Sequence, residues 1–224
     1  MTPTPGIVPV RRALVSVHDK KDLLGFADAL AELGVEFVAT ASTARTLRGA
    51  HIYVTNVSEV TGFPEIMGGR VKTLHPKIQG GILGRPGIDD AVMAEHGIEA
   101  FQLVVVNLYP FQRKADEGAD FDECVENIDV GGFTMIRAAA KNHAYVTVVV
   151  DPQEYERVLR EVKLQGGTTP QTRLALAYSA FTHTATYDSA VSQYLRERIF
   201  ATRVAEEGEE LIPPPEGDDE MSIF

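Results

Sequence analysis

Apolar and polar positions along the first 150 residues follow two alternating patterns. Short apolar runs rich in valine predict buried strands, and apolar residues at three- and four-residue spacing predict helices. The first pair is a strand at 13–17 and a helix at 23–33, after which Gly34 stands where a C-terminal helix glycine belongs. Further strands are predicted at 36–40, 52–57, 103–108 and 145–150, and further helices at 43–48, 89–95, 121–127, 134–141 and 152–164. This alternation predicts an α/β fold in which a central, mainly parallel sheet lies between two helical layers.

Two further stretches depart from this alternation. Residues 58–87 are dense in glycine and lack clean periodicity, and so long a loop in a compact domain is expected to contribute to a site. From Thr169-Pro170 a helical pattern continues to about Val204 with no strand after it. We therefore predict a core at 11–167 and a helical extension at 168–204 that packs on the core or on a second subunit.

Composition and charge exclude several classes of protein. Hydrophobic residues make up 44% of the 224 positions and charged residues 24%, as in globular proteins. No apolar run reaches the ~18 residues of a membrane-spanning helix, and residues 1–12 lack a signal-peptide core, so a cytoplasmic protein without membrane partners is expected. The single cysteine, Cys124, excludes an intrachain disulfide and a cysteine-based zinc site.

The net charge of −11 is concentrated at the C-terminal end. Residues 205–224 contain eight acidic side chains and no basic one, which leaves −3 for residues 1–204. Such a segment is typical of a disordered acidic tail. The charge argues against a nucleic-acid partner but is compatible with a local basic pocket.

Several residues that could bind a ligand follow predicted strands. Open α/β sheets bind ligands beyond the carboxyl ends of their strands, so these positions are candidates for a site. Ser16 and Lys20 follow the first predicted strand, and Thr40-Ala41-Ser42-Thr43 follows the second. Hydroxyls and free N–H groups at a helix start, with a lysine nearby, suit a phosphate. The same residue types are equally typical of helix N-caps, and these residues alone favour capping.

The stretch from Arg70 to Lys77 (RVKTLHPK) places three cations and a histidine within eight residues of an acidic chain. Charge clusters usually form a solvated surface. Glycine pairs before and after this stretch permit close backbone approach to a ligand, which favours a pocket.

Two more positions carry candidate chemistry. Asn107 and Tyr109 close the apolar run 103–108, although a tyrosine there is often only half-buried core. Asp129 and Lys141 are twelve residues apart across a predicted turn and helix, which could fold them into one site. A structural reading makes Asp129 a helix cap and Lys141 a partner of the helix dipole.

Taken together, these segments resemble a known family. RVKTLHP, VVNLYPF, IDVGG, AAAKNH and FTHTATYD are similar to the IMP cyclohydrolase domain of the bifunctional AICAR transformylase/IMP cyclohydrolase, over roughly residues 11–198. The resemblance implies a methylglyoxal-synthase-like fold and the closure of 5-formamidoimidazole-4-carboxamide ribotide (FAICAR) to IMP and water, with no cofactor and no metal. It also implies a possible homodimer and, since the transformylase domain is not in this chain, a separate transformylase. The chain is then either a stand-alone cyclohydrolase or a truncated piece of a longer protein, and we expect a stand-alone cyclohydrolase.

The resemblance also implies roles for individual residues. The catalytic set falls on Lys72, Tyr109, Asp129 and Lys141, and the nucleotide-binding residues fall on Ser16, Lys20, Thr40, Ser42, Thr43, Arg70, Thr73, Asn107 and Gly131. Two positions depart from the family. Thr40-Ala41-Ser42-Thr43 stands where relatives have a glycine-containing phosphate loop, and His18 stands where they have serine or tyrosine.

Two other functions fit the same fold. Methylglyoxal synthase would release phosphate from dihydroxyacetone phosphate, but it gives no reason for the NLYPF and AAAKNH segments. A nucleotide-sensing regulatory domain, like that of carbamoyl phosphate synthetase, would bind IMP without turnover and would not need Lys72, Asp129 and Lys141 together.

Overall fold

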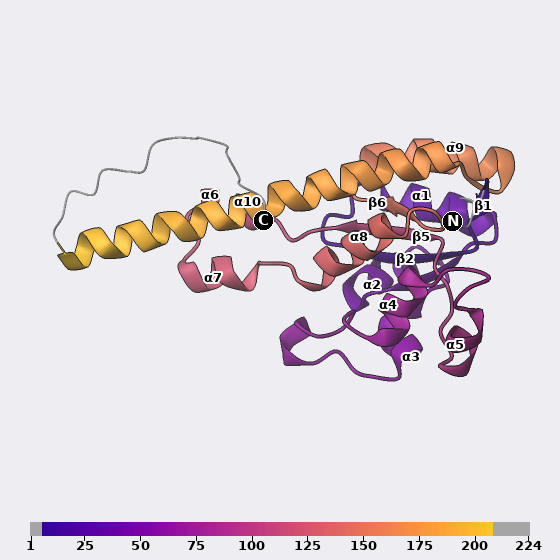
Figure 1. The fold of residues 1–224 in the computed structure, drawn as a ribbon, viewed down its shortest axis with the longest axis horizontal. Helices are drawn as coiled ribbons and strands as arrows, with labels where there is room; N and C mark the ends of the chain where they lie inside the picture. Colours follow the sequence, from indigo (N-terminus) through magenta and orange to yellow (C-terminus); the bar gives the residue numbers. More distant parts are fainter. Residues whose placement is uncertain (1–5, 208–224) are drawn as a thin grey trace.

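A five-stranded, fully parallel sheet forms the centre of the molecule. The computed structural model describes residues 6–207, and Figure 1 shows their arrangement. The strands lie in the order β4 (Thr55–Asn56), β3 (Glu36–Ala39), β2 (Arg12–Val17), β5 (Leu103–Asn107) and β6 (Thr147–Val149). Every neighbouring pair is parallel, which confirms the predicted sheet. The apolar run 103–108 is an interior strand, between β2 and β6, while β2 takes the middle place.

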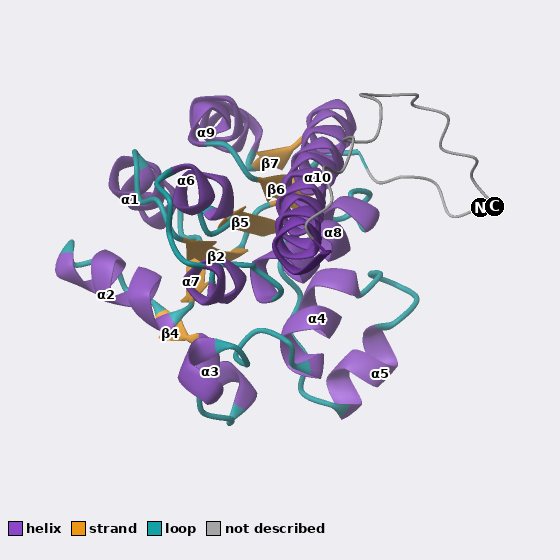
Figure 2. Ribbon diagram, turned by 90° about the vertical axis from the view of Figure 1, so that its left-hand side faces the viewer, coloured by secondary structure: helices purple, strands orange, loops and turns teal. Residues whose placement is uncertain are grey.

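Helices cover both faces of the sheet, as the alternating pattern predicted (Figure 2). One layer contains α1 (Leu23–Glu32), α2 (Ala41–Gly49) and α9 (Tyr155–Gln165). The other contains α3 (Val57–Thr61), α4 (Pro76–Leu83), α8 (Gly131–Lys141) and α10 (Pro170–Glu207). Shorter helices are α5 (Asp90–Glu95), α6 (Phe111–Asp116), α7 (Phe121–Glu126), and the 3-10 turns η1 (Met67–Gly69) and η2 (Pro152–Glu154).

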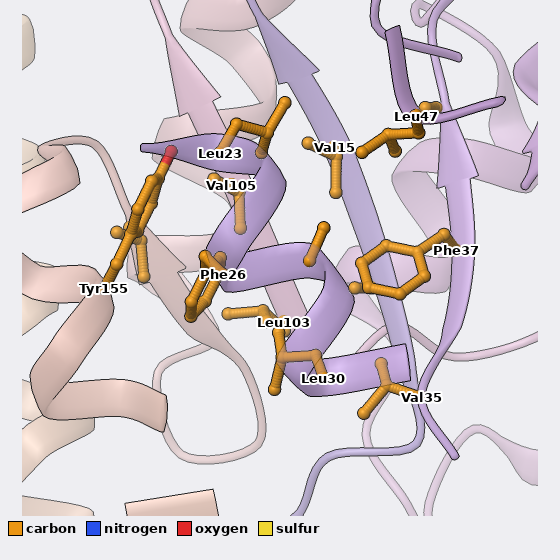
Figure 3. Close-up of a cluster of buried hydrophobic side chains, with 14 of the residues drawn as sticks. Val15, Leu23, Phe26, Leu30, Val35, Phe37, Leu47, Leu103, Val105 and Tyr155 are labelled. Carbon is orange, nitrogen blue, oxygen red and sulfur yellow. The ribbon is translucent and has the colours of Figure 1, made fainter. Parts of the chain in front are cut away.

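Each helical layer packs on the sheet through its own apolar core. Under α1, the side chains of Phe26, Leu30, Phe37 and Leu103 belong to one buried cluster, and Phe26 stacks on Tyr155 with ring centroids 4.3 Å apart (Figure 3). On the opposite face, α4 and α8 bury isoleucines and a methionine against β5. Burial of each such side chain contributes about 1.5 to 3 kcal/mol, so the sheet is a rigid support for the loops at its edge.

A second, two-stranded sheet was not predicted. β1 (Val8–Pro9) pairs antiparallel with β7 (Gly167–Thr168), because the two backbones approach closely. A Cβ at Gly167 would lie 2.1 Å from the Val8 carbonyl oxygen, so only glycine fits there. The fully buried Arg173 donates to the carbonyls of Gly6 and Thr168 and thereby joins α10 to this sheet. The compact core therefore includes residues before position 11.

Helix α10 is one continuous helix, in agreement with the predicted helical run. It packs on α8 and β6, and its second half continues past the sheet (Figure 1). Of the predicted acidic tail at 205–224, residues 208–224 lie outside the described residues. None of the helices within residues 6–207 combines the length and apolar character needed to cross a membrane.

Several element boundaries differ from the predicted ones. The strand expected at 52–57 is only two residues long, because Val57 already begins α3 behind a capping box formed by Asn56 and Glu59. Helix α2 begins two residues earlier than predicted and α8 three residues earlier, at Gly131. Glycines are poor interior helix formers, and the pair Gly131-Gly132 concealed the start of α8.

Candidate active site

A cleft of about 200 Å³ opens at the carboxyl ends of β2, β3 and β5. This is the edge at which open α/β sheets bind ligands. The cleft contains most of the residues that the sequence singled out. It is lined by Ser16, Val17, His18, Lys20, Thr40, Ala41, Ser42, Arg45, Glu65, Lys72, Thr73, Asn107, Tyr109, Asp129 and Gly132.

The end of β3 presents the first turn of α2 to the cleft. Thr40 is the N-cap residue by its backbone angles, yet its hydroxyl makes no capping hydrogen bond and donates to the Ser16 hydroxyl at 3.2 Å. Side-chain capping is therefore not the role of Thr40. Ala41 and Ser42 continue the helix in ordinary backbone space without positive φ, as the replacement of glycine by Ala41 requires. The uncapped N–H groups and positive dipole end of α2 favour an anion here.

Thr43 and Lys20 hold the neighbouring strand end. The fully buried Thr43 hydroxyl accepts from the Val17 N–H at 3.2 Å and donates to its carbonyl at 3.3 Å. Thr43 is therefore not among the cleft-lining residues, in contrast to the implied ligand contact. The Lys20 ammonium donates to the carbonyls of Val17 and His18, and burial lowers its pKa. Three ammonium hydrogens leave one for a ligand.

The Asn107 side chain fixes the loop that carries His18. Its carbonyl oxygen accepts from the N–H groups of His18 and Asp19, at 2.6 and 3.1 Å, and its amide donates to the Asp19 carbonyl. The His18 ring then lies edge-on to Tyr109, with centroids 5.4 Å apart. Burial, followed by the charges of Lys20 and Arg113, lowers the pKa of His18, so the imidazole is neutral at pH 7.

A tight turn brings Lys72 into the cleft. The backbone bridges Ile66 to Val71 around η1, and Gly69 takes a φ of +96°. The positive φ favours glycine at this position, and a Cβ on Gly69 would in addition lie 2.6 Å from the Glu65 carboxylate, which would have to move. The Lys72 ammonium is 3.9 Å from that carboxylate and 3.4 Å from the Tyr109 hydroxyl. Lys72 therefore links the turn to the end of β5.

Asp129 lies where α8 begins. It stands one residue before the N-cap residue Val130, and its carboxylate accepts from the Gly132 N–H at 2.7 Å and lines the cleft. Burial raises the pKa of Asp129, against the opposing effects of backbone N–H groups and of the Lys72 charge. A raised pKa in a cleft is typical of a proton-transfer group.

The Thr73 hydroxyl is fully buried and has no hydrogen-bond partner among the described residues. A Cβ at Gly131 would lie 2.7 Å from it, so Gly131 is required for close packing beside the cleft. An unpartnered buried hydroxyl is unfavourable, and a polar group of a ligand would satisfy it.

Besides Thr43 and Gly131, two more of the implied residues do not line the cleft. Arg70 forms an exposed ion pair with Glu126. Lys141 is exposed at the last turn of α8, and ten residues of helix separate it from Gly131 by about 15 Å. The structure does not bring Lys141 together with Asp129 within one chain, and Lys141 takes the helix-dipole position weighed above. The RVKTLHPK segment also does not act as one unit. Lys72 and Thr73 line the cleft, whereas His75 caps α4 by accepting from the Lys77 N–H.

The structure adds two charged residues that sequence reasoning missed, Arg45 and Glu65. Arg45 follows Ser42 by three residues on α2, a helical spacing that places both on one side. Glu65 has no comparable signal, because only the turn at 66–71 brings it to Lys72. With Lys20, Arg45 and Lys72 facing the cleft, its charge suits an anionic ligand. No group of three or more His, Cys, Asp or Glu side chains suited to a metal occurs within residues 6–207.

Comparison with known proteins identifies the family of this chain. Residues 22–134 match the MGS-like domain, and residues 139–213 match the AICARFT/IMPCHase bienzyme. The chain belongs to the AICARFT/IMPCHase family. Within that family it carries the MGS-like α/β fold that the sequence predicted. The crystal structure of ForH is 37% identical, covers 82% of this chain and 97% of its own, and superimposes with a TM-score of 0.71.

Proposed function

We propose that this chain is an IMP cyclohydrolase, which joins the carboxamide nitrogen of FAICAR to its formyl carbon and thereby closes the six-membered ring to give IMP and water. The observation that carries the proposal is the convergence of Lys72, Tyr109 and Asp129 on one cleft at the carboxyl edge of a parallel sheet. The family match supports the same reaction class.

The α2 side of the cleft supports a phosphate site for a nucleotide. The helix N-terminus at Thr40, the Ser42 hydroxyl and the cations Lys20 and Arg45 all line it. Each is a donor or a positive charge, and a dianionic phosphate requires both. Ser16 joins this group through its hydrogen bond with Thr40.

The opposite side supports the ring closure. The carboxamide nitrogen and the formyl carbon already belong to one molecule, so binding the reactive conformer gains effective molarities of ~10⁵ to 10⁸ M. The remaining barrier is the negative charge that develops on the formyl oxygen. The Lys72 ammonium and the Tyr109 hydroxyl, 3.4 Å apart, present donors suited to that charge.

Proton transfer completes the reaction. The attacking carboxamide nitrogen and the formamide nitrogen each lose one proton, and the former formyl oxygen takes up two protons and leaves as water. Burial raises the pKa of Asp129 from the ordinary carboxylate range, which strengthens its carboxylate as a base. We assign the carboxamide proton to Asp129.

The test is turnover of FAICAR by the pure chain. Chelator-treated, folate-free protein is incubated with FAICAR, and IMP is followed by absorbance and mass spectrometry. We expect IMP to form far above the buffer rate. The absence of such formation would overturn the proposal, and phosphate release from dihydroxyacetone phosphate or IMP binding without turnover would favour the two alternative functions.

We further propose that the chain acts in the cytoplasm as a homodimer. The second half of α10 supports the dimer, because Val191, Leu195 and Ile199 recur every four residues beside Phe200 on a surface depression. Sedimentation of the wild type and of Leu195→Asp tests it: a dimer dissociated by the aspartate is expected, and a monomeric wild type would contradict it.

A further inference from the structure

Helix α10 reaches the cleft segment through one side chain, Tyr187. The Tyr187 hydroxyl accepts from the Asp129 N–H at 2.9 Å and donates to the Asn127 carbonyl at 3.1 Å. One hydroxyl thus uses both its acceptor and its donor capacity on two backbone groups that lie two residues apart.

The backbone at 127–130 depends on this hydroxyl because it belongs to neither a helix nor a strand. It joins the end of α7 to the start of α8. Buried backbone polar groups need partners, and a segment between two helices has no ladder to supply them. Tyr187 supplies a partner for the Asp129 N–H and for the Asn127 carbonyl.

The position of the Tyr187 ring is itself well fixed. The half-buried ring contacts Phe111 and Phe133, with centroids 6.2 and 6.4 Å away. Helix α10 packs on α8 and β6, and Arg173 joins its first turns to the two-stranded sheet. Burial raises the pKa of Tyr187 to about 12, so the hydroxyl keeps its proton throughout the neutral range.

The side chain of Asp129 has little freedom once its backbone is held. The Gly132 N–H binds one carboxylate oxygen at 2.7 Å, and a Cβ at Gly132 would lie 2.7 Å from the other. The backbone contact with Tyr187 and the contact at Gly132 together direct the carboxylate into the cleft.

We propose that Tyr187 is a positioning residue of the site, which orients the Asp129 carboxylate by bridging the Asn127 and Asp129 backbone groups. Helix α10 is then part of the catalytic architecture and not only an appended support. The kinetic part of this inference rests on the proposed cyclohydrolase function, whereas the structural part does not.

The kinetic test compares Tyr187→Phe with a matched control, Tyr194→Phe. Tyr194 lies on the same helix and also contacts Phe111, but its hydroxyl is engaged by Arg198 one turn further along α10. For Tyr187→Phe we expect kcat to fall at least 10-fold, KM to change less than 3-fold and the acid limb of the pH–rate profile to shift. Tyr194→Phe is expected to stay within 2-fold of wild type, and equal kinetics in the two variants would overturn the proposal.

The structural test does not depend on activity. Amide hydrogen exchange at Asp129 is expected to be at least 10-fold faster in Tyr187→Phe than in wild type and unchanged in Tyr194→Phe. Unchanged exchange at Asp129 in Tyr187→Phe would overturn the positioning role. If the wild type fails to convert FAICAR, the proposed function fails while this exchange measurement still decides the role of Tyr187.

A second variant covers the case in which Tyr187→Phe does not fold. Replacement of Tyr187 by 3,5-difluorotyrosine preserves ring size but lowers the pKa of the phenol. At alkaline pH the resulting phenolate can no longer donate to the Asn127 carbonyl and is repelled by that oxygen and by the Asp129 carboxylate. The bridge between the two backbone groups is then expected to open, and exchange at Asp129 to accelerate as the phenol ionises. Exchange with the ordinary pH dependence of the wild type would contradict the proposal.

Discussion

The Lys72 ammonium lies 3.4 Å from the Tyr109 hydroxyl, although the two residues are 37 positions apart in the chain. One comes from the glycine turn after α3 and the other from the end of β5. The Glu65 carboxylate lies 3.9 Å from the same ammonium. Lys72 and Tyr109 therefore present two donors to one point of the cleft.

We predict that Lys72 and Tyr109 act on the same developing charge. Lys72→Ala is expected to lower kcat on the order of 10²-fold, as loss of an oxyanion donor does. In the double variant with Tyr109→Phe, the total loss should be smaller than the product of the single losses, because contacting residues are coupled. Steady-state kinetics of the four proteins measures this coupling, and independent effects would contradict a shared role.

Asp129→Asn is predicted to be more stable than wild type at neutral pH. The pKa of Asp129 is raised by burial above its value in the unfolded chain, so the ionised carboxylate lowers the stability of the folded state. This cost is absent at low pH, where the carboxyl is protonated in both states, and develops as pH rises through the folded pKa. In thermal unfolding from pH 3 to 8, the Tm of Asp129→Asn should exceed that of the wild type by a margin that grows as pH rises. A Tm for Asp129→Asn below that of the wild type at pH 7 would refute this prediction.

Thr73 and Thr43 together test whether the Thr73 hydroxyl binds a ligand, with Thr43 as the control. The Thr73 hydroxyl is buried without a partner, while the Thr43 hydroxyl bonds the Val17 backbone. Thr43→Val should lower the free energy of unfolding by about 1 to 3 kcal/mol, and Thr73→Val should leave it unchanged or raise it slightly. Conversely, Thr73→Val should weaken IMP binding. Denaturant titration and calorimetry distinguish the two, and a stability loss in Thr73→Val equal to that in Thr43→Val would show that its hydroxyl is satisfied within the protein.

The phosphate end of the cleft is tested at Lys20. Lys20→Ala should weaken IMP binding by about 1 to 3 kcal/mol, the range for a charge-assisted hydrogen bond, and leave inosine binding nearly unchanged. Calorimetry with both ligands measures the difference. Equal losses would mean that Lys20 supports the loop through its contacts with Val17 and His18 and does not hold the phosphate.

The sequence was informative where periodicity and burial coincide. Strands β2, β3 and β5 are valine-rich or apolar runs that alternate with amphipathic helices, so the parallel sheet and the residues at its edge could be predicted. Strands β1 and β7 could not, because two-residue strands containing Pro9 and Gly167 have no periodicity. Their pairing depends on a close approach of distant backbones.

The site shows the same limit. Lys72, Tyr109 and Asp129 were assigned from motifs, yet Glu65 was missed because its place depends on positive φ angles in the turn at 66–71. The position of Lys141 was hidden by the start of α8. Once α8 begins at Gly131, the helical rise alone separates Lys141 from Asp129, and the glycine pair concealed that start.

The most direct measurement is kcat for IMP formation from FAICAR by the wild type, Lys72→Ala and Lys141→Ala. We predict turnover by the wild type, a loss on the order of 10²-fold in Lys72→Ala, and a kcat for Lys141→Ala within about threefold of wild type, because Lys141 lies at the far end of α8. A wild-type rate no faster than buffer, or full activity in Lys72→Ala, would contradict the cyclohydrolase assignment. A loss in Lys141→Ala as large as that in Lys72→Ala would contradict a site built from one chain.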